Sequence, residues 1–231
     1  AMDARPGLRL LLGHGSGSFG HFAGRKHGTR QGIQSGREAE CWAGYAETGA
    51  AAARLDRHVV EALLTAGVPA VPFPPSASAR CAGGRLADLA WQPIAEALER
   101  RLLPVVYGDV ALDCEQGCTI VSTEEVFACL LGHIPPARIL LAGTVDGVFT
   151  ADPLRDPAAL RLPHIDAEGD VAWAGLGASH GVDVTGGMQS KVAEMAALVR
   201  AYPGLIVHIL SGKTPGAIAG ALVDPDYPAG T

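Results

Sequence analysis

Short runs of Val, Ile and Leu alternate along the chain with longer stretches that have the periodicity of helices. This alternation is typical of a mostly parallel β-sheet that is covered by helices on both faces. The predicted strands are residues 8–12, 69–73, 103–107, 139–142 and 206–210. The predicted helices are residues 38–65, 86–101, 123–131 and 188–202. We therefore expect the α/β fold class, with ligands bound at the loops that follow the strands.

Composition narrows the architecture and the partners. The chain has 231 residues, 48% of them hydrophobic, which is enough to bury one large core, so we expect a single domain over residues 1–231. The net charge of −6 argues against a nucleic-acid partner or an anionic membrane surface. The sequence has no apolar run of 18 residues that would span a bilayer. An anionic ligand must therefore be held by a local site.

The cysteines indicate a compartment rather than a metal site. Their number, five, is odd and their spacing is irregular, which is typical of reduced thiols in the cytoplasm. Cys114 and Cys118 are spaced as zinc ligands can be, but no second Cys or His pair follows them. We predict a cytoplasmic protein whose side chains form no metal site.

A glycine-rich segment, GHGSGSFGH, follows the first predicted strand and spans residues 13–21. Gly15, Gly17 and Gly20 allow the backbone to approach an anion and to direct several N–H groups at it. The same glycines satisfy the G-x-G-x-x-G pattern of dinucleotide-binding folds, but the chain fits that fold poorly. The fold also needs a helix directly after the glycines and a second strand that ends in an acidic residue about 20 positions on. We expect a basic loop up to residue 36 instead. His21 either donates a hydrogen bond to a phosphate oxygen or closes the loop.

Two further segments lie at the ends of predicted strands. In YGDVALD, residues 107–113, Gly108 either lets the chain turn beside a ligand or forms a hairpin. In IVSTEE, residues 120–125, Ser122 or Thr123 is a natural N-cap for a helix that has acidic residues in its first turn. Helix capping alone explains the residues of the second segment, whether or not the segment also has a catalytic role.

The last two segments lie in the second half of the chain. TVDGVFTADP, residues 144–153, contains two turn signals, and loops of this kind can wrap a nucleotide. In VTGGMQSK, residues 184–191, two glycines lead into a helix whose first turn is expected to carry Lys191. Exposed N–H groups, the helix dipole and an ammonium group then converge, which favours a bound phosphate.

The order of these segments resembles the amino acid kinase family, and most of all its isopentenyl phosphate kinases. The resemblance rests on GSFGH at residues 17–21, YGDV at 107–110 and TGGM with Lys191 at 185–191. It implies an open, mainly parallel sheet sandwiched between helical layers, the carbamate-kinase-like fold. It also implies an acceptor-binding half at about residues 8–131, an ATP-binding half at about residues 132–231, and a homodimer.

The activity implied by the resemblance is phosphorylation of isopentenyl phosphate by ATP with Mg²⁺. Catalytic roles fall to His21 on the acceptor phosphate, to Lys191 on the ATP phosphates and to Glu124, which would orient a lysine. The other residues implied on the acceptor side are Gly15, Ser16, Gly108, Asp109 and Thr123. The other residues implied on the nucleotide side are Gly17, Ser18, Thr144, Asp146, Gly147, Val148, Phe149, Asp152 and Gly187.

The chain departs from the family pattern in three respects. Ser16 stands where a glycine is usual, and Glu124 stands where many relatives have an aspartate. The family's first strand, with its Lys-x-Gly-Gly-Ser, is apparently missing from residues 1–231. Such a strand and its connecting helix take about 30 to 45 residues, and we expect them upstream in the native protein. Without them we expect weak ATP binding and slow turnover.

Two other functions fit the same sequence. A kinase of small phosphonates, of the fosfomycin-resistance type, shares a glycine loop that ends in His. A catalytically silent nucleotide-binding or storage subunit of the same fold also fits, because the family's N-terminal lysine is absent from these residues. Turnover of isopentenyl phosphate, turnover of fosfomycin and binding of ATP alone would separate the three functions.

Overall fold

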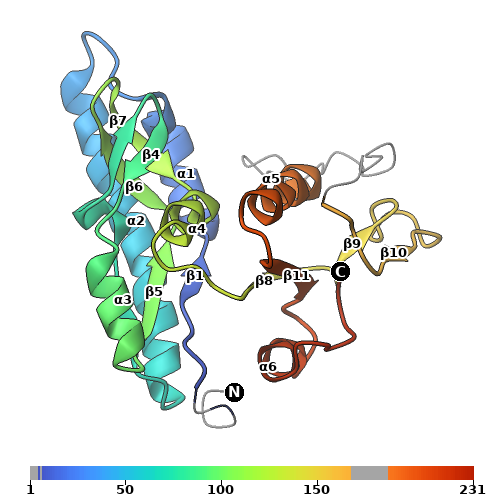
Figure 1. The fold of residues 1–231 in the computed structure, drawn as a ribbon. Coiled ribbons are helices and arrows are strands. Elements are labelled where there is room, and N and C mark those ends of the chain that lie inside the picture. The colour runs from blue at the N-terminus through green and yellow to red at the C-terminus, as the bar shows by residue number, and fades with distance from the viewer. Residues whose placement is uncertain (1–4, 6, 168–186) are drawn as a thin grey trace. The chain divides into compact units, whose positions relative to one another are not determined.

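A computed structural model of the protein describes residues 5, 7–167 and 187–231, without the side chains of residues 18, 21, 187, 189 and 190 (Figure 1). The chain divides into two compact units at Pro135. We call Leu8–Pro135 the N-terminal unit and Pro136–Thr231 the C-terminal unit. Each unit contains parallel strands with helices packed on them, which confirms the predicted α/β class with mainly parallel sheets.

The first sheet of the N-terminal unit is parallel and has the order β1-β5-β2. Its members are β1 (Leu12–His14), β5 (Leu103–Tyr107) and β2 (Ala70–Pro72). All five residues of β5 are buried, because the strand has a neighbour on each side and helices on both faces. The predicted strand at residues 8–12 is displaced, since pairing with β5 begins only at Leu12 and continues to His14.

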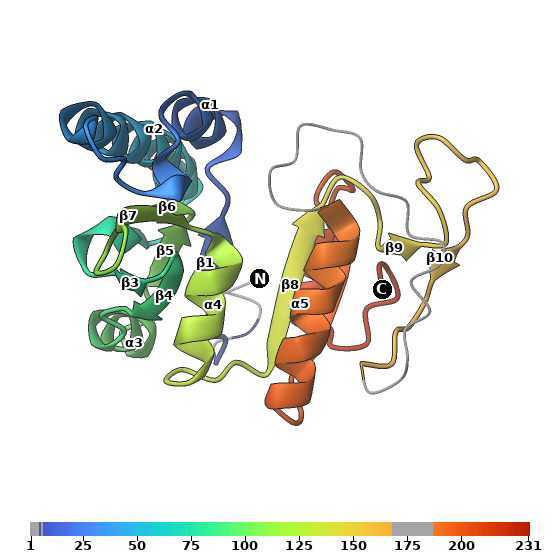
Figure 2. The same ribbon diagram turned by 90° about the horizontal axis from the view of Figure 1, so that it is seen from above.

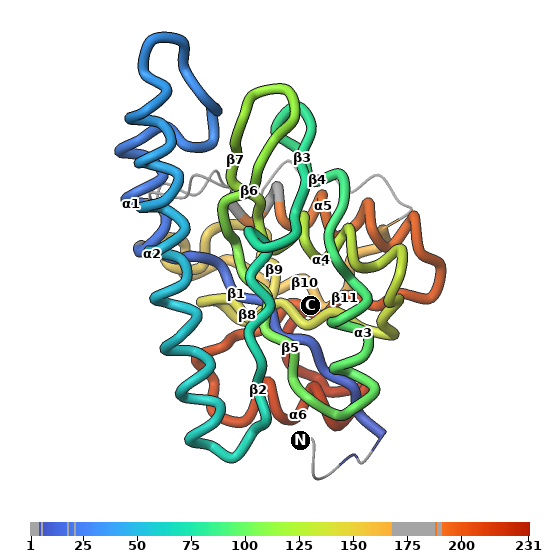
Figure 3. Tube along the Cα trace, turned by 90° about the vertical axis from the view of Figure 1, so that its left-hand side faces the viewer, coloured from blue at the N-terminus to red at the C-terminus, as the bar shows by residue number. Residues whose placement is uncertain are grey.

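A second, mixed sheet has the order β4-β3-β6-β7. It is built from two hairpins, which Figure 3 shows side by side: β3 (Arg80–Ala82) with β4 (Arg85–Asp88), and β6 (Asp109–Asp113) with β7 (Gly117–Val121). The prediction of a helix over residues 86–101 is therefore wrong for its first part. Gly83 and Gly84 both have positive φ and make the tight turn of the first hairpin. The helix α3 begins only at Gln92 and ends at Glu99.

Four helices cover the two faces of these strands. Figure 2 shows α1 (Gly17–His27) and α2 (Glu38–Thr65) on one face, and α3 with α4 (Thr123–Leu131) on the other. Two short 3₁₀ turns, η1 (Thr29–Gln31) and η2 (Pro75–Ala77), complete the unit. The predictions of α2 and α4 are confirmed to the residue, because both rest on strong local signals.

Apolar side chains of β5 alternate between two core clusters, as the pleat of a strand requires. Leu103 and Val105 pack with Val60 of α2 on one face. Val106 packs with α3 and α4 on the other, in a cluster that includes Ile94. This fully buried strand fixes the position of Tyr107 and of the turn that follows it.

Helix α1 corrects the prediction of a basic loop between the glycines and residue 36. Gly17 takes a left-handed φ of +53°, which lets the chain leave β1 and enter a helix at once. A small residue on α2 allows α1 to pack closely, because an added Cβ on Gly44 would clash with Cβ of His27 at the end of α1. The expected absence of a helix directly after the glycines was one of our two grounds for excluding a dinucleotide fold, and that ground was wrong.

The C-terminal unit is built on two parallel strands, β8 (Arg138–Gly143) and β11 (Ile206–Ser211). Figure 1 shows α5 (Gly187–Ala201) and α6 (Ala217–Val223) on opposite faces of this pair. The antiparallel pair β9 (Val148–Phe149) and β10 (Arg161–Leu162) lies beside it. These elements confirm the strands predicted at 139–142 and 206–210 and the helix predicted at 188–202. Within the described residues, no helix has the length and apolar character needed to cross a membrane.

Candidate functional site

The turn from β1 into α1 brings together residues that the sequence predicted for acceptor binding. The carbonyl oxygen of His14 accepts a hydrogen bond from Thr123 Oγ1 at 2.7 Å and another from the N–H of Gly108 at 3.1 Å. A Cβ on Gly108 would lie 3.7 Å from Ser16 N and 3.7 Å from Thr123 Oγ1. Gly108 and Thr123 therefore share one carbonyl acceptor and Ser16 lies beside Gly108, although the three residues are far apart in sequence. We call these three residues, with Gly15, the acceptor cluster.

The first glycine of the motif has a packing role that sequence reasoning did not assign. A Cβ on Gly13 would lie only 2.5 Å from the ring of Phe127 and 2.6 Å from the methyl group of Thr123. Glycine is thus needed for β1 to lie against the start of α4. This close approach places the Thr123 hydroxyl within reach of the His14 carbonyl.

The start of α1 lacks the capping that the start of α4 has. Ser122 and Glu125 form a complete capping box on α4. Ser16, the N-cap of α1, accepts no capping hydrogen bond with its side chain, and the first turn of α1 has no acidic residue. Because the first N–H groups of a helix have no partner within it, this end of α1 can offer donors and a positive dipole to an anion.

Several predicted residues lie along α1 and at the start of α4. Gly17, Ser18 and His21 belong to the first part of α1, and the side chains of Ser18 and His21 lie outside the described part of the chain. Glu124 follows Thr123 in the first turn of α4, next to the acceptor cluster in sequence. The structure thus places the backbone that carries these residues but leaves their roles as predictions.

Asp109 serves the fold with its side chain. It is 2% exposed, and its carboxylate accepts hydrogen bonds from the N–H groups of Ser76, at 3.1 Å, and Val110, at 2.8 Å. Burial raises the pKa of Asp109, although these hydrogen bonds oppose the rise. The carboxylate therefore holds η2 against β6, and substrate binding by this side chain stays a prediction that the contacts do not support.

Two of the predicted nucleotide residues, Thr144 and Asp146, lie in the loop at the carboxyl end of β8. Thr144 is exposed in the loop after β8. Asp146, in the same loop, accepts a hydrogen bond from Ser211 N at 3.1 Å, and its other oxygen lies 3.6 Å from Arg161 Nη1. Ligands bind at this end of strands in open α/β sheets. The carboxylate of Asp146 connects the two strand ends and shapes the loop.

Of the next three predicted residues, Gly147 and Val148 contact Thr231 and Phe149 pairs with β10. The N–H of Val148 donates to Thr231 Oγ1 at 2.8 Å, and that hydroxyl donates to the Leu162 carbonyl at 2.6 Å. Gly147 has a φ of +109°, and a Cβ there would lie 2.5 Å from Thr231 Oγ1. Phe149 pairs with β10. Sequence reasoning missed Thr231, because a single threonine in no motif carries no signal of this contact.

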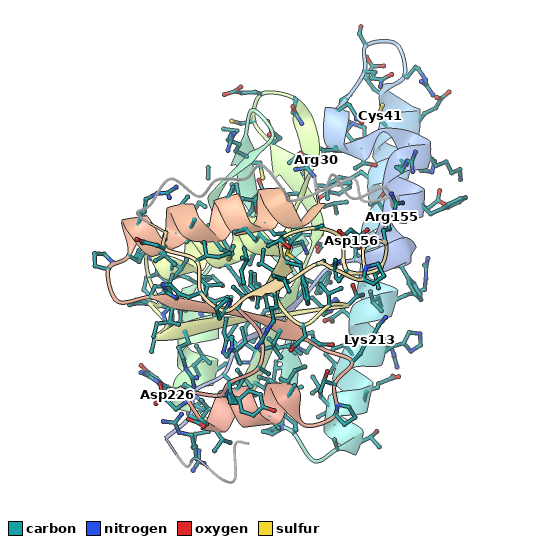
Figure 4. The ribbon with its side chains drawn as sticks, turned by 90° about the vertical axis from the view of Figure 1, so that its right-hand side faces the viewer. Arg30, Cys41, Arg155, Asp156, Lys213 and Asp226 are labelled. Carbon is teal, nitrogen blue, oxygen red and sulfur yellow. The ribbon has the colours of Figure 1, made fainter. Side chains whose placement is uncertain are left out.

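Asp152 organises the loop between β9 and β10. Its carboxylate accepts a hydrogen bond from Leu154 N at 2.9 Å, and its carbonyl accepts from the N–H groups of Arg155 and Asp156. Figure 4 shows Arg155 and Asp156 on this loop. The predicted turn at Asp152 is present, while nucleotide binding by its side chain stays a prediction.

The last motif begins outside the described residues, since 184–186 belong to the undescribed range. Gly187 is the first residue of α5, and Lys191 is the fifth. Lys191 therefore lies at the start of the second turn and not in the first turn as predicted. A lysine side chain is long enough to reach the helix N-terminus from there, so the expected role on the ATP phosphates is unaffected by this correction.

Two residues of the N-terminal unit were missed altogether. His14 Nε2 lies 3.2 Å from Asp56 Oδ1, and both side chains are largely buried. The sequence shows only that His14 stands within the glycine-rich segment and that Asp56 lies in the helix predicted over residues 38–65, between Leu55 and Arg57. Neither residue matches a motif, so sequence reasoning gave neither of them a role.

The described part of the chain contains no evident metal site. No group of three or more His, Cys, Asp or Glu side chains is placed there to hold an ion. All five cysteines are free thiols, three of them buried.

Comparison with known proteins gives consistent matches over nearly the whole chain. The model of the amino acid kinase family matches residues 2–211. The isopentenyl phosphate kinase of Methanothermobacter thermautotrophicus is 36% identical over 220 residues, covering 93% of this chain and 80% of that protein. The isopentenyl phosphate kinase of Haloferax volcanii is 35% identical over 201 residues, covering 84% and 77%. An X-ray structure of isopentenyl phosphate kinase superimposes with a TM-score of 0.80 at 29% identity, over 99% of this chain and 85% of that one.

Proposed function

The chain belongs to the amino acid kinase family, and on that premise we propose that it transfers the γ-phosphoryl group of ATP to isopentenyl phosphate. The products are isopentenyl diphosphate and ADP. The observation that carries the proposal is the acceptor cluster at the uncapped start of α1, where Gly108 and Thr123 donate to the His14 carbonyl and Ser16 N lies beside Gly108. This site suits a phosphate better than a neutral acceptor, because it presents backbone donors at a positive helix end.

Phosphoryl transfer asks a protein mainly for alignment and for neutralisation of charge on the phosphoryl oxygens. In the proposed reaction, His21 holds the acceptor phosphate, and the backbone N–H groups of residues 15–18 hold the phosphates that meet between acceptor and donor. Lys191 and the start of α5 hold the phosphates of ATP. The protein holds the two anions in line. The entropy cost of bringing them together is therefore met by binding and not in the chemical step.

No general base is needed for this acceptor. The second pKa of a phosphate monoester is about 6, so its oxygen is already largely deprotonated at pH 7. Glu124 is therefore assigned to orienting a lysine and not to proton abstraction. Mg²⁺ enters the reaction with ATP, bound to the phosphates, as is usual for kinases.

The compartment and the assembly belong to the same proposal. The five free thiols support a reducing compartment, and we place the reaction in the cytoplasm. A homodimer is inferred from the resemblance to the family. Analytical ultracentrifugation tests the dimer, because a species of one chain mass across the micromolar range would contradict it.

A coupled assay of ADP release tests the function in the full-length protein. Isopentenyl phosphate, fosfomycin and buffer without acceptor are compared at saturating ATP and Mg²⁺. We expect release that depends on isopentenyl phosphate and exceeds that with fosfomycin. Equal or faster release with fosfomycin would assign the chain to phosphonates, and ATP binding without release would assign it to the silent subunit.

A further inference from the structure

The ring of His14 lies at the end of β1, between α2 and β5, and is almost enclosed. Its side chain is 16% exposed, and that of Asp56 on α2 is 7% exposed. His14 Nε2 lies 3.2 Å from Asp56 Oδ1, and Nδ1 lies 3.0 Å from the carbonyl oxygen of Gly15. The ring also stacks on Tyr107, with centroids 5.4 Å apart. These contacts hold the imidazole in one place, directly before the glycine turn.

Both ring nitrogens of His14 face atoms that only accept hydrogen bonds. A carbonyl oxygen is an acceptor, and so is an ionised carboxylate. A neutral imidazole has one N–H and satisfies one of these contacts, whereas the imidazolium satisfies both. The pKa of His14 agrees: burial lowers it, but the hydrogen bonds to Asp56 and Gly15 and the charge of Asp56 together raise it above its ordinary value.

The titratable groups around the His14 ring come from different elements. Only one of them, the carboxylate of Asp56, is hydrogen-bonded to the ring. α2 supplies the Asp56 carboxylate. β5 supplies Tyr107, whose pKa is raised by burial and by the charges of Asp109 on β6 and Asp56, so the phenol stays neutral. α4 contributes only the Thr123 hydroxyl among the described contacts. α1 has three basic residues in its last turn, and the side chain of its other titratable residue, His21, lies outside the described part of the chain. Asp56 is therefore the group that sets the charge of the ring.

The bond from Nδ1 to the Gly15 carbonyl also orients a peptide group. A trans peptide is planar, so its C=O and its N–H point in opposite directions. With the Gly15 carbonyl turned toward the His14 ring, the N–H of Ser16 is turned away from the ring. Ser16 N is also the atom that lies next to Gly108 in the acceptor cluster. Glycine adopts many backbone conformations, so the glycine turn is not rigid by itself. The hydrogen bond to the His14 ring restricts its conformation.

We propose that His14 is a positioning residue for the acceptor phosphate: as an imidazolium held by Asp56, it fixes the Gly15 peptide and thereby the start of α1. The proposal rests on the proposed function, because it assigns the acceptor to that helix end. A raised pKa means that the contribution is present below the unfolded pKa and is lost as the pH rises through the folded one. Deprotonation also leaves Asp56 buried without a cation.

The charge of the ring is measured directly by two-bond ¹H–¹⁵N NMR of the histidine side chains. The full-length protein is titrated, and His14 is assigned by its loss in His14→Gln. We expect both ring nitrogens of His14 to stay protonated above the ordinary histidine pKa of about 6.5, and to lose this property in Asp56→Asn. A neutral His14 ring at that pH in the wild type would overturn the proposal, whether or not the variants fold.

The kinetic test separates acceptor from donor. KM for isopentenyl phosphate and KM for ATP are measured against pH in wild type, Asp56→Asn and the control His27→Gln, whose histidine makes a similar bond to Glu47 at 2.7 Å. We expect Asp56→Asn to raise the acceptor KM about 3- to 10-fold at pH 7, the factor expected for one hydrogen bond, with an unchanged ATP KM. The wild-type acceptor KM should rise at alkaline pH, and the control should follow the wild type.

The outcomes keep the two proposals apart. An Asp56→Asn variant that shifts both KM values equally, or that keeps the wild-type pH profile, would reduce His14 to a structural role. A wild-type protein without turnover of isopentenyl phosphate would contradict the proposed function instead. In that case the NMR titration still decides the charge of His14.

Discussion

His21 and Lys191 are assigned to different phosphates, so their loss should affect different substrates. We predict that His21→Ala loses most activity and keeps its affinity for ATP. The lost charge-assisted hydrogen bond to the acceptor corresponds to about 1.5 to 3 kcal/mol of transition-state stabilisation. Steady-state kinetics and ATP titration calorimetry check this prediction. Turnover close to that of the wild type would show that His21 only closes the glycine turn.

Lys191→Ala should weaken both ATP binding and turnover, because the ammonium group neutralises charge on the ATP phosphates. A tenfold loss in ATP affinity or more is expected, equivalent to about 1.4 kcal/mol. Lys26→Ala is the matched control, since it removes the same charge from an exposed pair with Glu47. If the two variants bind ATP alike, Lys191 does not belong to the site.

At the scale of elements, the β6–β7 hairpin contains the best-defined titratable group outside the site. The carboxylate of Asp113 accepts hydrogen bonds from the N–H groups of Gly84 at 2.7 Å, Glu115 at 2.8 Å and Gln116 at 3.0 Å. Burial alone would raise the pKa of Asp113, but the hydrogen bonds outweigh it and the pKa is lowered. The stability that Asp113 contributes is therefore present above its unfolded pKa, near 3.9, and is lost as the pH falls through the folded value.

Urea unfolding of wild type and Asp113→Asn against pH tests this prediction. We expect the variant to be less stable at pH 7, with a difference that shrinks as the pH falls below about 4. Asp226→Asn, at an exposed position seen in Figure 4, should show no such pH dependence. A stability difference that is constant with pH would mean that the charge of Asp113 does not matter.

Elements with strong local signals could be predicted, and those set by pairing could not. The capping residue Ser122 and the apolar run of β5 made α4 and β5 visible in the sequence. Residues 86–88 have helical periodicity but form β4, because pairing with β3 overrides propensity. α1 was missed because its glycines argue against a helix, whereas packing on α2 stabilises it.

At the scale of the whole molecule, the sequence predicted residues of the candidate site. It did not predict which of them are in contact. The glycines, Thr123 and Lys191 were found through motifs with family order. The bond between His14 and Asp56 spans 42 positions, and that between Val148 and Thr231 spans 83, so neither leaves a local pattern. Such contacts depend on the order of the strands in the sheets. The sequence predicts the α/β fold class but not that order.

The proposed acceptor of the phosphoryl group is the phosphate of isopentenyl phosphate, and ³¹P NMR observes that phosphorus itself. The full-length protein is incubated with ATP, Mg²⁺ and isopentenyl phosphate while spectra are recorded. We expect the acceptor singlet to be replaced by the two coupled resonances of a diphosphate ester, in a one-to-one ratio with ADP. Inorganic phosphate as the only new product, or no change with isopentenyl phosphate under conditions in which fosfomycin is phosphorylated, would show that the acceptor is a different one.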